Sequence, residues 1–160
     1  MIFVVLGTHE LPFPRLLQEV ERVKQEGLIE DEIIVQCGHT KYESDVMTLK
    51  PFFSFDKMDL LYDQARLIIS HAGSGSIISG VKKGKKVIAA PRLKKHGEHN
   101  DDHQLELVDV FTKKGHILAW HEQDRLEDMI KEAESFEPKP YRSGKEHILK
   151  LIEQFISDVK

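Results

Sequence analysis

Short apolar runs alternate with amphipathic segments along the whole chain, and each apolar run has the length of a buried strand. Neighbouring residues within a run are both apolar, so the runs show no alternation of apolar and polar positions. Strands of this kind are typical of a parallel sheet that is covered on both faces. The pattern predicts strands over residues 2–6, 32–38, 66–70, 85–91 and 116–120, with a short extended piece over 51–55.

The segments between these strands carry apolar residues at helical spacing, and glycines or prolines close them. We expect Asp56 to cap one of these helices. The predicted buried faces contain Leu16, Leu17, Val20, Val23, Leu105, Val108 and Phe111. The predicted helices cover residues 13–27, 56–65, 75–84, 100–115, 124–135 and 143–159.

A helix follows nearly every predicted strand, which indicates an α/β fold with a Rossmann-like, doubly wound parallel sheet of about six strands. The length of 160 residues is typical of one domain. We therefore expect a single domain over residues 1–160, closed by helices within residues 124–160. Ligands of such folds bind outside the carboxyl ends of the strands. The loops over residues 7–10, 37–44, 70–76 and 91–104 are thus the candidate binding loops.

The last predicted helix carries a stripe of apolar residues, Ile148, Leu151, Ile152 and Phe155. Such a stripe packs on its own domain in the first instance. The alternative is that it also contacts a partner protein.

Charge argues against a nucleic-acid partner. Hydrophobic residues make up 40% of the chain and charged residues 31%, with a formal net charge of -4 and a pI near 6.1. Such a chain has no basic footprint for nucleic acid. We interpret the basic pieces over residues 82–86 and 92–96 as solvated loop charge. A surface for anionic lipid headgroups or for an acidic partner is the alternative.

Neither a disulfide nor a metal site is indicated. Cys37 is the sole cysteine, and we interpret it as a small buried apolar side chain. No pair among the nine histidines has the HExxH spacing, so we expect no metal. The apolar run at residues 2–6 is too short for a signal peptide or a membrane span. We expect a cytoplasmic chain that meets a membrane only peripherally or through a partner.

The segment SHAGSGSIISG, residues 70–80, is the strongest candidate site. It leaves a predicted strand and enters a helix, so its unpaired backbone N–H groups lie at the positive end of the helix dipole. Glycines let a phosphate approach this backbone, and serine hydroxyls add donors. We interpret HAGSGS as a diphosphate cradle. His71 would donate a further hydrogen bond or, if protonated, a positive charge.

Other nucleotide-binding motifs fit this segment poorly. A Walker loop needs a lysine that the loop lacks. A dinucleotide fingerprint needs a third glycine three positions after the second, whereas only Gly80 follows Gly75. The acid expected at the end of the next strand is also missing. The remaining alternative is that the glycines only permit tight strand-to-helix packing.

The segments SHAGSGSIISG, GEHNDDHQLEL and FVVLGTHELPF together resemble the donor-binding half of the family 28 glycosyltransferases. The resemblance runs from residue 1 to about residue 120. It is greatest to small cytosolic subunits of two-component transferases. Some of these add N-acetylglucosamine to dolichol-linked saccharide, and others add galactose or glucuronic acid in bacterial capsule and exopolysaccharide synthesis. The resemblance implies a UDP-sugar donor and one half of a GT-B fold.

The resemblance also assigns roles to individual residues. Those implied to contact the donor diphosphate are Gly7, Thr8, His71, Gly73, Ser74, Gly75 and Ser76. His103 and Gln104 match the segment that reads the hydroxyls of the donor sugar. Family members carry an acid for the ribose where this chain has Ser79. Either Ser79 makes this bond, or a carboxylate such as Glu98 or Glu106 does, or the ribose is held otherwise.

A GT-B enzyme needs a second half, which would supply the acceptor site. The resemblance therefore implies a membrane-associated acceptor-binding subunit and a lipid-linked saccharide acceptor. The implied reaction is an inverting transfer without a metal or other cofactor, in which His71 and the loop amides stabilise the departing diphosphate. We expect the partner to supply the general base, and His9 and His39 are the candidates within this chain.

Two alternatives stay open at this point. The chain could be a nucleotide-sugar-binding enhancer subunit that does not itself catalyse transfer. It could also be half of a nucleotide-sugar epimerase, which would need no acceptor.

Overall fold

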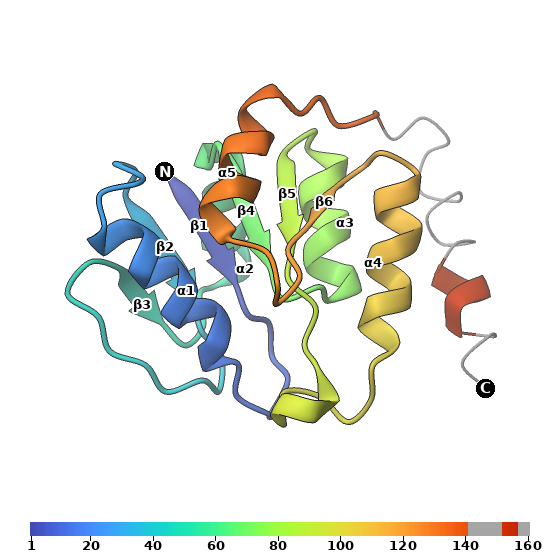
Figure 1. Cartoon of the computed structure of the whole chain (residues 1–160), viewed down its shortest axis with the longest axis horizontal. Coiled ribbons are helices and arrows are strands. Elements are labelled where there is room, and N and C mark those ends of the chain that lie inside the picture. The colour runs from blue at the N-terminus through green and yellow to red at the C-terminus, as the bar shows by residue number, and fades with distance from the viewer. Residues whose placement is uncertain (141–151, 157–160) are drawn as a thin grey trace.

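Six parallel strands form the centre of the computed structural model, which describes residues 1–140 and 152–156 (Figure 1). Their order across the sheet is β3-β2-β1-β4-β5-β6. The strands are β1 (Ile2–Val5), β2 (Ile33–Gln36), β3 (Thr48–Lys50), β4 (Leu67–Ser70), β5 (Lys86–Ala89) and β6 (Leu118–Ala119). The prediction of a doubly wound α/β sheet is confirmed.

Helices cover both faces of this sheet (Figure 1). One face packs against α1 (Pro14–Gln25) and α5 (Leu126–Ser135). The other face packs against α2 (Phe55–Gln64), α3 (Ser74–Lys82) and α4 (His103–Lys113). A short 3₁₀ helix, Lys94–His96, lies between β5 and α4.

The strand β1 shows why the apolar runs are continuous. Ile2 and Val4 belong to the core under α1 and α5, whereas Phe3 and Val5 belong to the core under α2, α3 and α4. All four side chains are buried, because both faces of the strand are covered.

The order of the strands reverses between β1 and β4. The chain runs from β1 to β2 and β3 on one side, and then from β4 to β5 and β6 on the other. The crevice at the carboxyl ends of such a pair is where open α/β sheets bind ligands. The loops after β1 and β4, which contain Gly7 and the segment 70–76, therefore meet at the switch point.

Three local predictions are wrong. Ser54, rather than Asp56, caps α2, since its hydroxyl accepts a hydrogen bond from the Lys57 N–H at 3.2 Å. The strand β3 precedes the predicted extended piece 51–55, which instead joins β3 to the start of α2. Leu105 is exposed, because Leu107, Val108 and Phe111 form the buried face of α4.

The prediction of two closing helices is only partly tested. The first is α5, whereas residues 143–151 and 157–159 of the second lie outside the described residues, and with them Ile148 and Leu151. Ile152 and Phe155 pack, partly buried, against the core under α2, α3 and α4. In the described part of the chain, no helix is long and apolar enough to cross a bilayer.

An ion pair near the amino ends of β1 and β4 makes stability depend on pH. The Arg66 guanidinium donates to both Asp31 oxygens at 2.7 Å and lowers the pKa of Asp31 from 3.8 to about 2. The stabilisation is therefore present above pH 3.8 and is lost as the pH falls towards 2. We expect Asp31→Asn to cost about 1 kcal/mol at pH 6, because solvent screens the half-exposed Arg66. Urea unfolding should show this difference vanish near pH 2.

The matched control is Asp45→Asn, which removes an exposed carboxylate without an ion pair among the described residues. It should leave stability unchanged at both pH values. An Asp31→Asn difference that persists at pH 2 would contradict the ion-pair explanation.

Candidate functional site

A cavity of about 910 Å³ lies at the carboxyl edge of the sheet, between α2 and α3. It is lined by nine of the predicted site residues, from the loop after β1, the loop after β4 and α3: Gly7, Thr8, His9, His71, Gly73, Ser74, Gly75, Ser76 and Ser79. Four predicted residues do not line it, namely Glu98, His103, Gln104 and Glu106. The two glycine-containing loops are thus brought together, whereas the predicted sugar-reading segment lies elsewhere.

The amino end of α3 opens into this cavity without a side-chain cap. Gly73 is the N-cap residue, and the first hydrogen bond within the helix runs from the Ile77 N–H to the Gly73 carbonyl. The N–H groups of Ser74, Gly75 and Ser76 therefore have no partner inside the helix. Such a terminus attracts an anion through its N–H groups and its dipole.

A chain of hydroxyl bonds fixes the turn before α3. The Ala72 N–H donates to Ser70 Oγ at 3.1 Å, Ser70 Oγ lies 2.6 Å from Ser76 Oγ, and Ser76 Oγ donates to the Gly73 carbonyl at 2.9 Å. Ala72 has a φ of 69°, a left-handed conformation that is uncommon outside glycine. The Ser76 hydroxyl proton is thus used within the turn, and its backbone N–H is the donor left for an anion.

His71 fills the space between the two glycine-containing loops. A Cβ atom on Gly7 would lie 2.5 Å from His71 Nε2, and one on Gly73 would lie 2.4 Å away. The side chain is 9% exposed. Burial, followed by the positive charge of Arg92 and then His9 and His99, lowers the pKa of His71 to about 3. The imidazole is therefore neutral at pH 7 and can donate a hydrogen bond but no positive charge.

Gln36 holds the Gly7 loop and was not singled out by the sequence pattern. Its amide oxygen accepts from the Gly7 N–H at 2.9 Å, and its amide nitrogen donates to the carbonyls of Gly7 at 2.9 Å and Pro51 at 2.8 Å. Gly7 and Pro51 lie just beyond the ends of β1 and β3, and the buried Gln36 amide supplies hydrogen-bond partners to their backbone groups. In the sequence, the sign of this role was that Gln36 is the lone polar residue inside the apolar run 33–37.

Aromatic and sulfur-containing side chains form the opposite wall of the cavity, and this wall too was missed. It consists of Phe52, Phe53, Phe55, Met58 and Tyr62, from the start of α2 and the loop before it. Phe55 is 88% exposed, and exposed aromatic side chains gathered at a cavity mark a binding surface. The cluster PFFSF in a loop after a strand was the signal.

His9 lines the cavity, but its geometry does not favour a base. The Leu11 N–H donates to His9 Nδ1 at 3.0 Å, so the neutral ring carries its proton on Nε2. Burial and the neighbouring His99, whose ring centre lies 4.5 Å away, lower the pKa of His9. The ring is thus neutral. Its only lone pair, on Nδ1, already accepts the hydrogen bond from the Leu11 N–H, so it is not free to take a proton from a substrate. His39 lies outside the cavity and packs its ring against Phe52.

Glu98 has a structural role in place of a position in the cavity. Its carboxylate accepts from Arg15 Nε at 2.9 Å and from the Leu93 N–H at 3.0 Å, and it is 2% exposed. The alternative that Glu98 holds a ribose is therefore not supported. Glu106 is exposed on α4.

Neither residue of the predicted sugar-reading pair reaches the cavity. Gln104 Oε1 accepts from the Arg92 N–H at 3.0 Å, and His103 pairs with Asp101. The Ser79 hydroxyl does line the cavity, although it donates to the Gly75 carbonyl at 2.9 Å.

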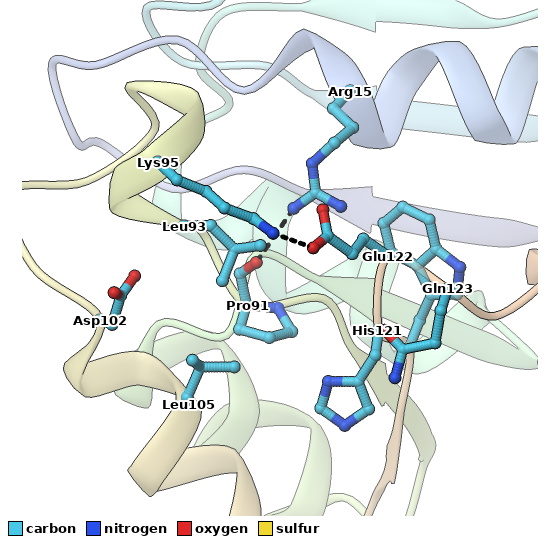
Figure 2. A pocket seen from close by; sticks show the side chains of 10 residues that line it. Arg15, Pro91, Leu93, Lys95, Asp102, Leu105, His121, Glu122 and Gln123 are labelled. Atoms are coloured by element: carbon cyan, nitrogen blue, oxygen red, sulfur yellow. Dashed lines mark hydrogen bonds and ion pairs between the residues drawn. The ribbon is translucent and has the colours of Figure 1, made fainter.

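A smaller cavity of about 280 Å³ lies beyond β5 and β6 at the same edge of the sheet (Figure 2). Figure 2 shows Arg15 reaching the Pro91 carbonyl and Lys95 paired with Glu122 across the opening. Asp102 and Leu105, at the start of α4, also line it. The start of α4 therefore faces this second space.

The role of Glu98 can be tested by Glu98→Gln. We expect a loss of about 2–3 kcal/mol in the free energy of unfolding, because Arg15 keeps a partly buried charge without its partner. Urea unfolding measures this loss. Glu106→Gln is the matched control and should change stability by less than about 0.5 kcal/mol. Unchanged stability with weakened UDP binding in Glu98→Gln would restore the ribose-binding alternative.

The prediction of solvated charge over residues 92–96 is wrong at its first residue. Arg92 is 1% exposed, whereas the three residues of the 3₁₀ helix are exposed. Among the residues that the structure describes, no group of three or more His, Cys, Asp or Glu side chains is placed to hold a metal ion.

The sequence model of the glycosyltransferase family 28 C-terminal domain matches residues 1–159. The chain belongs to this family. The resemblance to family 28, which rested on SHAGSGSIISG and two further segments, is therefore confirmed. The match extends over almost the full length of the sequence.

Several curated relatives of this chain are named UDP-N-acetylglucosamine transferase subunit ALG13. The protein of Yarrowia lipolytica is 30% identical over 139 residues, which cover 79% of this chain and 68% of that protein. The protein of Candida glabrata is 31% identical over 103 residues, which cover 63% and 47%. The human protein is 28% identical over 129 residues, and the match spans only 11% of its length.

Solved structures confirm the fold. The solution structure of ALG13 superposes with a TM-score of 0.62 at 19% identity, covering 97% of this chain and 96% of that chain. The glycotransferase of kitacinnamycin gives 0.63 at 17% identity, covering 98% of this chain but 39% of its own. Acinetobacter baumannii MurG gives 0.54 at 18% identity, covering 94% and 49%. This chain thus corresponds to less than half of the two larger enzymes.

Proposed function

We propose that this chain is the donor-binding subunit of an inverting glycosyltransferase that transfers a hexose from a UDP-sugar to a lipid-linked saccharide. Galactose, N-acetylglucosamine and glucuronic acid are the candidate sugars. N-acetylglucosamine is favoured, because the curated relatives are named UDP-N-acetylglucosamine transferase subunits. A role in capsule or exopolysaccharide synthesis stays a prediction.

The shape and chemistry of the large cavity carry this proposal. One wall offers the uncapped start of α3 and the neutral His71, which suit a diphosphate. The facing wall offers Phe52, Phe53 and Met58, which suit a planar base. A volume of about 910 Å³ is at the large end of small-molecule sites and accommodates a nucleotide sugar.

The proposed reaction is a single displacement at the anomeric carbon. The acceptor hydroxyl oxygen forms the new glycosidic bond, and the bond to the diphosphate oxygen breaks with its electron pair leaving on UDP. The N–H groups at the start of α3 and the neutral His71 stabilise the charge that develops on the diphosphate. We place the base that takes the hydroxyl proton on the partner, because Leu11 occupies the lone pair of His9.

The acceptor site belongs to a second protein in this proposal. The match is to a C-terminal domain, and this chain covers less than half of two complete glycosyltransferases. The relatives are named subunits, which supports an obligate partner. We place the complex at the cytoplasmic face of a membrane, where the partner would hold the lipid-linked acceptor.

Thermal unfolding with UDP, three UDP-sugars, ATP and NAD tests the donor site. A ligand at 100 times its dissociation constant stabilises the fold by about 2.7 kcal/mol, which raises the unfolding midpoint by several degrees. We expect UDP and UDP-N-acetylglucosamine to give this shift. A shift with NAD or ATP alone, or no shift with any UDP compound either alone or with the partner, would overturn the proposal.

Transfer assays with the partner then separate catalysis from assistance. Turnover that requires an intact donor cavity in this chain identifies the catalytic subunit. Turnover by the partner alone, which this chain merely raises, would favour an enhancer subunit instead.

A further inference from the structure

Arg92 is a buried cation without a carboxylate partner in its hydrogen bonds. Its side chain is 1% exposed. Its terminal nitrogens donate to three carbonyls, those of Leu6 at 2.9 Å, Leu11 at 2.7 Å and Glu98 at 3.1 Å. Buried arginines are rare unless paired with an acid, and the nearby carboxylate of Glu98 is taken by Arg15.

The fourth acceptor of Arg92 is His71. Arg92 Nε donates to His71 Nδ1 at 3.4 Å, and the guanidinium also lies over the Phe13 ring at 5.1 Å. Arginine has five N–H donors and no acceptor. His71 Nδ1 must therefore present its lone pair to Arg92, and a neutral ring then carries its proton on Nε2.

The proton on Nε2 lies on the cavity side of the ring. His71 lines the cavity and Arg92 does not, so Arg92 contacts the ring from behind. Within the described residues no hydrogen bond reaches Nε2. Nε2 is also the atom that a Cβ on Gly7 or Gly73 would strike. The free donor of His71 thus faces the gap between the two glycine-containing loops.

We propose that Arg92 is a positioning residue, which holds His71 in the tautomer whose Nε2–H points at the bound anion. Only the identity of that anion, the diphosphate of a UDP-sugar, rests on the proposed function. The same guanidinium fixes the loop after β1 through Leu6 and Leu11 and the loop after β5 through Glu98. One buried side chain therefore sets the ring orientation and the spacing of the loops around it.

This role explains the use of a cation at the site. A neutral amide at this position could either donate or accept, so it would permit both tautomers of His71. A guanidinium permits one tautomer, and its positive charge also opposes protonation of the ring. When His9 and His99 are themselves protonated, their charges also oppose protonation of His71, whereas the carboxylates of Glu10 and Asp101 favour the charged form of neighbouring His9.

The test is nitrogen NMR of histidine-labelled protein, which reports the tautomer without any activity assay. In the wild-type chain we expect an unprotonated Nδ1 and a protonated Nε2 for His71 from pH 5 to 8. In Arg92→Met we expect the His71 ring to begin to titrate within this range or to populate both tautomers. A wild-type ring that carries its proton on Nδ1, or that titrates near pH 6.5, overturns the proposal.

Two further variants separate positioning from general loss of stability. Arg15→Met removes the other arginine at this edge, which pairs with Glu98 but does not contact His71, and should leave the His71 signals unchanged. Arg92→Lys keeps a cationic donor and should restore the wild-type tautomer at reduced stability. Unchanged His71 signals in Arg92→Met, or equal changes in Arg15→Met, would overturn the proposal.

Kinetics with the partner connects the tautomer to the reaction. We expect Arg92→Met to lower kcat at least about tenfold, since a mispositioned tautomer loses a hydrogen bond made in the transition state. If UDP does not bind while the NMR tautomer is as expected, the proposed function fails and the positioning role stands. If UDP binds and the tautomer is the opposite one, the positioning role alone fails.

Discussion

His71→Ala should lower kcat/KM for transfer from the UDP-sugar by about 10²- to 10³-fold, the cost of removing one donor that stabilises developing negative charge. The donor is the Nε2–H of a neutral imidazole held between Gly7 and Gly73. Removal of this buried ring also costs stability, so the assay belongs at a temperature where calorimetry shows both proteins to be folded. Initial rates with the partner at several donor concentrations measure the effect.

His71→Gln provides a sharper comparison. A glutamine amide also donates, so this variant should retain more activity than His71→Ala if donation is the role of the ring. His96→Ala is the control, because His96 lies on the surface outside the cavity and pairs with Glu122. Equal rates for wild type and His71→Ala, with the complex intact, would rule out the proposed role in catalysis.

Gly73→Ala should destabilise the fold by about 1–3 kcal/mol and abolish UDP binding. Its Cβ atom would lie 2.4 Å from both His71 Nε2 and Cε1, which real Cβ atoms do not approach. His71 is held from behind by Arg92 and faces Gly7 on its other side, so the ring has little room to move away. Urea unfolding gives the stability loss, and calorimetric titration with UDP gives the affinity.

Gly75→Ala is the matched variant, two residues further along the chain and inside α3. Apart from its chain neighbours and the backbone of its own helix, no atom lies within 4 Å of the added Cβ, and the position is in the first turn of a helix. We expect stability equal to wild type or up to about 1 kcal/mol higher, because alanine has less chain entropy to lose than glycine. Similar stability losses in the two variants would show that the His71 contact is not the cause.

Much of the fold could be predicted because parallel strands buried on both faces leave a local signature. Ile2 to Val5 are apolar at every position, and a helix-period segment follows. The segment 70–76 could be recognised for a similar reason, since a short run of glycine and serine between a strand and a helix has few physical uses. The misplaced cap at Asp56 concerned single-residue detail, which helix patterns specify weakly.

The remainder of the candidate site depends on contacts between residues far apart in the sequence. Gln36 bonds to Gly7, and Glu98 to Arg15, across 29 and 83 positions. Glu98 therefore resembled a ligand-binding carboxylate in the sequence, although its charge neutralises an arginine beside the sheet. The aromatic wall from Phe52 to Tyr62 likewise becomes a wall only where α2 packs beside α3.

What the sequence by itself determined is the order of strands and helices and the position of the candidate anion-binding loop, because apolar period and glycine spacing act over a few residues. What the tertiary structure alone decided is the burial of the side chains around that loop and the protonation state of His71. Arg92 reads as one more charge in a basic run, yet it is buried against His71 and three carbonyls. Burial and charge proximity, which make His71 a neutral donor with one tautomer, exist only once β1, β4 and β5 lie side by side.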